Sequence, residues 1–153
     1  MLSDRLIKMV ESHADELTRR TVMSLRSSPS TPSYSQLSDD DIFERVYSVY
    51  HNFGRWLGAK SDDPLQSWYH HLGEKRFQQG IPLSEVIWAL TLTKRDSWDY
   101  IRLHGLADTA LELHAQQELH MLLDYFFDRS VFFTAQGYEQ AASGRTHRAA
   151  AAK

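Results

Sequence analysis

Apolar residues recur at helical spacing in five long stretches of the chain, and no stretch shows the strict alternation that is typical of a β-strand. The first stretch covers about residues 3–26, with Leu6, Val10 and Leu17 on one side of the predicted helix. A segment rich in serine and proline, residues 27–36, follows it and predicts a loop. The pattern therefore favours an all-α protein.

Capping residues mark where the next two helices begin and end. Ser38 precedes three aspartates and predicts the start of a helix to about residue 60, because carboxylates are favourable near a helix N-terminus. Pro64, with Asp63 as the cap, predicts the start of a third helix. Gly80 suits the left-handed position that follows a helix, so we expect the third helix to end there.

Two further helices complete the predicted fold. Pro82 separates the third helix from a fourth, which covers about residues 83–104. The fifth is predicted over residues 108–143, a rod of roughly 50 Å. Residues 1–143 then form one domain, and residues 144–153 form a flexible tail or a truncated linker. We expect an all-α bundle of about five helices with a long C-terminal helix.

The middle of the fifth helix is apolar on more than one side. Leu119, Leu122 and Phe126 form one stripe, whereas Met121 and Tyr125 belong to another. A helix that packs on one core needs a single stripe, so we expect this helix to pack against its own domain and against a second copy of the chain. A central helix surrounded within one chain is the alternative. The predicted residues of the dimer interface are Leu119, Leu122, Tyr125, Phe126 and Phe133.

Composition excludes several classes of protein. The formal net charge is −3, whereas a protein that binds duplex nucleic acid normally has a basic face. The chain has no cysteine, which excludes disulfides, thiolate metal sites and cysteine nucleophiles. No segment has the length and apolarity of a membrane span, and the N-terminal segment lacks the apolar core of a secretory signal. We therefore expect a cytoplasmic protein.

The eight histidines do not have the spacing of a metal site. No two of them lie four residues apart, H-E-x-x-H is missing, and His71 with Glu74 is a lone pair of a kind that is common by chance. The chain also lacks the G-x-S-x-G elbow, the P-loop and the G-x-G-x-x-G fingerprint. We therefore predict no metal, no cofactor and no enzymatic activity.

One charged residue lies where the third helix should be apolar. Leu65, Trp68 and Leu72 define the inward side of that helix, and Arg76 falls in the middle of it. Arg76 can lay its methylenes on the core and send its guanidinium to water. Alternatively, it points inward and must then meet a buried carboxylate or an anionic ligand, since an unpaired buried charge is too costly.

The segment around Arg76 contains the pattern L-G-x-x-R-x-x-x-G-x-x-L-x-E-V-x-x-A-L. This pattern is formed by Leu72, Gly73, Arg76, Gly80, Leu83, Glu85, Val86, Ala89 and Leu90. With the helices before it and the long helix after it, the segment resembles the N-terminal sensory domains of RsbR-type stressosome proteins. The resemblance implies a globin-like fold that binds no haem, a homodimer, and a signal passed through the final helix to an output domain or a partner protein.

The same segment is similar to globin-coupled sensors, which bind haem iron through a histidine four residues before the glycine. Arg76 has that place here, and a guanidinium has no lone pair to give a metal. The leading hypothesis is therefore a haem-free sensory or regulatory domain without enzymatic activity. The alternatives are a haem-binding gas sensor that uses a histidine of another helix, and a protein-interaction domain without a ligand.

If the domain binds a ligand, we expect the pocket between the second, third and fourth helices. Aromatic and aliphatic side chains would form its walls, as they do in most ligand sites, with Arg76 as the charged group. The predicted lining residues are Phe53, Trp56, Trp68, Leu72, Arg76, Ile87 and Leu90.

Overall fold

Helices account for the regular structure of the described residues. The computed structural model describes residues 2–58, 61–105 and 107–152, and within these ranges it has seven α-helices, one 3-10 helix and no strand. The elements are, in chain order, α1 (Leu2–Ser12), α2 (Ala14–Ser27), η1 (Pro32–Gln36), α3 (Asp39–His51), α4 (Phe53–Leu57), α5 (Asp63–Gln78), α6 (Leu83–His104) and α7 (Ala110–Ala151). The prediction of an all-α bundle with a long C-terminal helix is confirmed.

Two helices that the sequence predicts as continuous are each divided by one residue, so the described α-helices number seven instead of five. His13 separates α1 from α2, with φ −114° and ψ 24°. Asn52 separates α3 from α4 in the same way, with φ −107° and ψ 28°. Periodicity does not reveal the first break, because Val10 and Leu17 are buried on either side of it.

At Ser38, Pro64, Gly80 and Pro82, the helix boundary lies within two residues of the prediction. Gly80 has φ 74°, the left-handed conformation that follows α5, and the Ile81 N–H donates to Arg76 O at 3.0 Å. Ser38 caps α3, because its hydroxyl accepts the Asp41 N–H at 3.2 Å. α6 has the predicted bounds.

α7 is longer than the sequence predicts. It begins at Ala110 and continues through Gly144 to Ala151, so most of the predicted tail, residues 144–153, is helical. A single glycine weakens a helix without ending it, and the alanines that follow are the strongest helix formers. The 42 residues of α7 make a rod of about 63 Å. That these last residues lead into a further segment stays a prediction.

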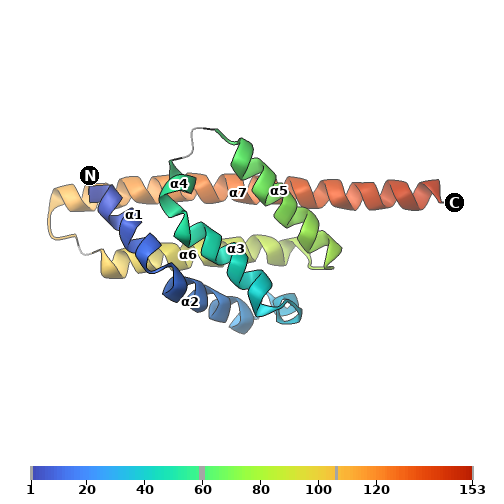
Figure 1. The fold of residues 1–153 in the computed structure, drawn as a ribbon, viewed down its shortest axis with the longest axis horizontal. Coiled ribbons are helices and arrows are strands. Elements are labelled where there is room, and N and C mark those ends of the chain that lie inside the picture. The colour runs from blue at the N-terminus through green and yellow to red at the C-terminus, as the bar shows by residue number, and fades with distance from the viewer. Residues whose placement is uncertain (1, 59–60, 106, 153) are drawn as a thin grey trace.

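α7 packs against α1, α4, α5 and α6, and α2 and α3 pack in turn on some of these helices. Figure 1 shows α5 crossing α7, α6 running alongside it, and the C-terminal part of α7 extending beyond every other helix. The inner side of α7 contributes large side chains to the core, all almost wholly buried: Leu119, Leu123, Phe126 and Phe127. Removing such apolar surface from water is the main force that holds a bundle of this kind together.

α5 and α7 approach so closely that their backbones are in contact. A Cβ atom added to Gly73 on α5 would lie 2.0 Å from Thr134 O of α7. One added to Gly137 on α7 would lie 2.1 Å from His70 O of α5. Any side chain at either position would separate the two helices. Gly73 is the glycine of the L-G-x-x-R pattern, so the pattern specifies a close helix crossing as well as a charged residue.

Gly73→Ala is expected to lower the free energy of unfolding by about 2 to 3 kcal/mol, because overpacking forces the two backbones apart. Urea unfolding followed by circular dichroism measures the change. Gly144→Ala is the matched control: nothing lies within 4 Å of its added Cβ. Alanine in a helix is more stable than glycine by roughly 0.5 to 1 kcal/mol, so this control should gain stability. Equal unfolding midpoints for the two variants would contradict the close crossing.

Candidate functional site

Arg76 lies inside the protein, and a carboxylate meets it there. Its side chain is 2% exposed, and its Nη1 donates to Asp41 Oδ2 at 3.0 Å. The same nitrogen donates to Gln79 Oε1 at 2.8 Å. Asp41 belongs to the first turn of α3, so the ion pair joins α3 to the last turn of α5. The interpretation in which Arg76 reaches out to water is wrong, and the inward alternative with a carboxylate partner is correct.

Asp41 collects three side chains from the end of α5. Besides the bond from Arg76, Lys75 Nζ lies 3.0 Å from Oδ1, and Gln79 Nε2 donates to Oδ2 at 2.8 Å. Partial burial raises the pKa of Asp41. The hydrogen bonds from Gln79 and Lys75 and the charge of Arg76 outweigh that effect and lower this pKa to about 2. The carboxylate is therefore ionised at neutral pH.

Glu85, the second charged residue of the pattern, holds the same region from α6. It is buried, and its carboxylate accepts the Ser33 N–H at 3.0 Å and the Ser33 hydroxyl at 3.1 Å. The next residue in η1, Tyr34, has its ring 5.6 Å from the guanidinium carbon of Arg76. Arg76 and Glu85 thus hold opposite ends of the segment 33–41, which runs from η1 into the first turn of α3.

Sequence reasoning missed Asp41 and Ser33. The three aspartates at residues 39–41 are sufficiently explained by the dipole of α3, and nothing local distinguishes the third of them. The signal that points to Asp41 is the need of a buried Arg76 for a carboxylate. The two residues are 35 positions apart in the chain, which hides the pair from local patterns.

A small pocket lies beside Arg76. Its volume is about 40 Å³, and its mostly apolar walls come from α2, η1, α3, α5 and α6. Four of the seven predicted lining residues contribute to it: Trp68, Leu72, Arg76 and Leu90. The other three do not line it: Phe53, Trp56 and Ile87. Phe53 and Trp56 belong to α4, which follows the break at Asn52 and packs against α1 and α7.

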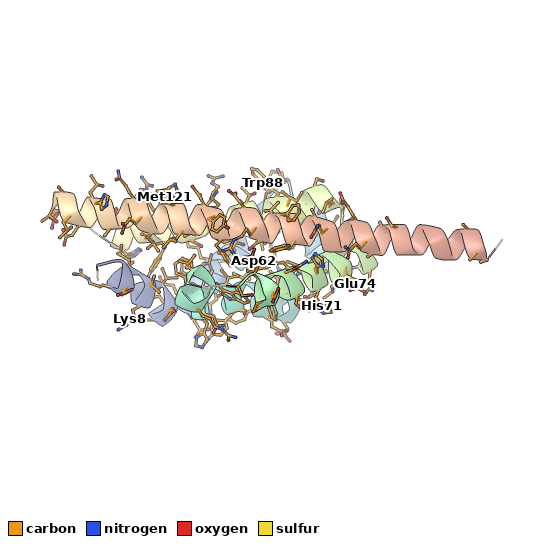
Figure 2. All side chains as sticks on the ribbon, turned by 90° about the horizontal axis from the view of Figure 1, so that it is seen from above. Lys8, Asp62, His71, Glu74, Trp88 and Met121 are labelled. Carbon is orange, nitrogen blue, oxygen red and sulfur yellow. The ribbon has the colours of Figure 1, made fainter. Side chains whose placement is uncertain are left out.

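The predicted dimer residues divide between two sides of α7. Three of them are buried in the core of their own domain and cannot also meet a second copy: Leu119, Phe126 and Phe133. The other two, Leu122 and Tyr125, are 44% and 60% exposed. Met121 and Phe132, which the prediction leaves out, are 71% and 57% exposed, and Met121 lies on the surface of α7 in Figure 2. We call these four exposed residues the apolar stripe.

The histidines whose side chains the structure describes are distributed over the surface and the helix contacts. Within the described ranges, no group of three or more metal-binding side chains could hold an ion. His71 and Glu74 are exposed on α5 (Figure 2), whereas His70 Nε2 bonds Gln136 Oε1 of α7 at 2.9 Å. None of the described helices is long and apolar enough to cross a membrane.

Comparison with known protein families identifies the class of this helical domain. The family described as RsbT co-antagonist protein rsbRD N-terminal domain matches residues 14–152, which contain every element from α2 to α7. The chain belongs to this family, and the resemblance inferred from residues 72–90 is confirmed. No match was found among curated proteins or among solved structures. Membership of the family supports a place in stressosome signalling.

Arg76→Leu is expected to lower the free energy of unfolding by roughly 3 to 5 kcal/mol, because it removes the buried member of the ion pair and leaves Asp41 with Lys75 and Gln79 alone. Lys75→Met is the matched control. Lys75 contacts the same carboxylate but is 36% exposed, and its loss is expected to cost at most about 1 kcal/mol. Urea unfolding measures both variants. An Arg76→Leu protein as stable as the wild type would rule out a structural ion pair.

The lowered pKa of Asp41 predicts a loss of stability in acid. The ordinary pKa is 3.8 and that of folded Asp41 is about 2, so the stabilisation is complete above the ordinary value and lost as the pH falls through the folded one. Because Asp41 is partly solvated, the loss is at most about 2 kcal/mol. Urea unfolding over this pH window should show that the free energy of unfolding depends less on pH in Asp41→Asn than in the wild type. Asp40→Asn, at an exposed neighbour, is the control, and equal slopes for both variants would refute the assignment.

Proposed function

We propose that this domain is a non-enzymatic sensory or regulatory module of bacterial stressosome-type signalling. In this proposal it works in the cytoplasm as a haem-free homodimer and passes a signal along α7. Its family supports the signalling role. The shape of α7 and the residues on its outer side support the dimer and the route of the signal.

The observation that carries the proposal is the apolar stripe on the outer side of α7. Met121, Tyr125 and Phe132 are separated by four and seven residues, a spacing that keeps side chains in line along a helix. Two aromatic rings, a methionine and a leucine are exposed together there, and contiguous exposed apolar surface is typical of an interaction site. A second copy of α7 would cover them in a two-fold interface.

α7 connects the interior of the domain with this surface. Leu123 and Phe126 pack into the core, while Tyr125, between them in sequence, points outward. A shift of α7 against the core would therefore move the apolar stripe as well. The helix extends beyond the bundle to Ala151 (Figure 1), where an output domain or a partner protein would receive the signal. Such coupling needs two discrete arrangements of the α7 pair.

The pattern around Arg76 is well placed to influence α7. Arg76 and Gly73 are three residues apart on α5, and Arg76 is tied to Asp41 while Gly73 touches the backbone of Thr134 on α7. α5 is therefore held at its end by the ion pair and in its middle by α7. A ligand or contact that alters the pair would act on α7 through this helix.

Arg76 also supports the proposal that the domain works without haem. By resemblance, it stands where haem-binding relatives use a histidine, and its guanidinium is engaged by Asp41 and Gln79. The pocket beside it has a volume of about 40 Å³. Pockets that bind cofactors or drug-sized ligands have volumes of roughly 300 Å³ or more.

The wild-type chain is expected to sediment as a dimer at micromolar concentration, with twice the 17.7 kDa mass of one copy. Tyr125→Glu is expected to produce a monomer, because it places like charges opposite each other in the centre of a two-fold interface. Analytical ultracentrifugation measures the mass, and circular dichroism checks that the variant keeps its helices.

Met23→Glu is the control for this experiment, because Met23 is an exposed apolar residue of α2 and not of the apolar stripe. It should leave the dimer unchanged. A wild-type chain that stays monomeric would refute the dimer and, with it, the proposed route of the signal. A Tyr125→Glu protein that dimerises like the wild type would show that the interface lies elsewhere.

A further inference from the structure

The pocket beside Arg76 contains more positive charge than its carboxylate balances. Arg45 on α3 and Arg76 on α5 both line it, and Asp41 is the carboxylate bound to Arg76. Asp41 is shared with Lys75 as well. The carboxylate of Glu85 is bound by η1 and does not compensate either guanidinium directly. Two guanidinium groups therefore line a small apolar space, and of the two only Arg76 is paired with a carboxylate.

Arg45 has no carboxylate partner within ion-pair distance in the described part of the chain. Its guanidinium carbon lies 4.5 Å from the centre of the Trp68 ring, and its hydrogen bond to Trp68 O is long, at 3.4 Å. The adjacent acid on α3, Glu44, is exposed. Burial, followed by the charge of Arg76, lowers the pKa of Arg45. The charges of Asp41 and Glu44 act in the opposite direction, but neither carboxylate forms an ion pair with Arg45.

Arg76 supplies a second unused donor. Its bonds to Asp41 and Gln79 are both made by Nη1, whereas Nε is buried and has no hydrogen-bond partner among the described residues. A buried N–H without an acceptor is unfavourable, and such groups are nearly always satisfied in folded proteins. An anionic acceptor in the pocket would satisfy Nε and balance the charge of Arg45.

The walls of the pocket indicate the chemistry and the size of the rest of the ligand. They are mainly aliphatic: Ile42, Val46, Val49, Leu72, Val86 and Leu90. The volume of about 40 Å³ has room for only a few non-hydrogen atoms. A carboxylate with a short alkyl group has this size and this division between a charged and an apolar end. Nucleotides and phosphorylated sugars are too large.

We propose that this pocket binds a small aliphatic monocarboxylate, of the size of acetate or propionate. Its carboxylate accepts hydrogen bonds from Arg76 Nε and from Arg45, and its alkyl group contacts the aliphatic walls. Hydrogen bonds between two ionised groups are stronger than neutral ones, so a small ligand can be held. Binding itself is independent of the dimer, whereas a role for the carboxylate as the input signal rests on the proposed function.

Titration of the 153-residue protein with sodium propionate tests the proposal, by calorimetry and by thermal unfolding. We expect saturable heat and a Tm that rises with propionate concentration, since a ligand of the folded state stabilises it. Propionamide has the same shape without the charge and should have no effect. Sodium gluconate keeps the ionic strength equal and is too large to enter. An equal Tm rise with either compound would overturn the proposal.

Arg45→Gln separates specific binding from a general effect of salt. It removes the guanidinium that forms no ion pair with Asp41 or Glu44, and we expect the Kd for propionate to rise at least about tenfold. Arg55→Gln, the same change at an exposed position of α4, should leave the Kd unchanged. Equal Kd values for these two variants would overturn the assignment of Arg45.

Ala89→Leu tests the pocket from a lining residue on α6, because the larger side chain fills the space and should abolish binding. If either pocket variant fails to fold, the other decides. Propionate that binds both Arg45→Gln and Ala89→Leu like the wild type would show that the site is elsewhere. A wild-type dimer without saturable propionate binding would refute this inference and leave the proposed function standing.

Discussion

A buried arginine must lie close to a carboxylate, and much of this fold follows from that requirement. The periodicity of α5 places Arg76 on its inward side, so the first turn of α3 has to bring Asp41 within hydrogen-bond distance. Glu85 binds Ser33 in the same region, and the segment 33–41 is held at both ends. Two requirements for satisfying buried charge therefore determine how η1, α3, α5 and α6 are arranged.

The second constraint is the contact between α5 and α7. Because Gly73 and Gly137 have no side chains, the two backbones touch, and the position of α5 determines that of α7 directly. α7 has one side in the core and the other side exposed, with the apolar stripe on it. The apolar stripe is the surface proposed to bind a second copy. The ion pair at Arg76 is connected to it through the packed backbones of α5 and α7, and not through flexible side chains.

The family pattern has a physical explanation at most of its positions. Gly73 permits the close crossing, Arg76 and Glu85 hold the segment 33–41, and Gly80 adopts the left-handed turn. The remaining apolar positions include residues that line the pocket beside Arg76: Leu72, Val86, Ala89 and Leu90. The pattern describes one structural unit, the corner between α5 and α6 with its pocket. This explains why a short segment was enough to indicate a family whose match covers residues 14–152.

The sequence by itself determined the all-α class, most helix ends and the inward place of Arg76, because caps, left-handed glycines and periodicity act within a few residues. It did not reveal the break at His13, since the apolar pattern continues through that residue. Only the tertiary structure decided that Asp41 is the partner of Arg76 and which side of α7 is buried. Both depend on the packing of elements far apart in the chain, and a helix that is apolar nearly all round is compatible with more than one side facing the core.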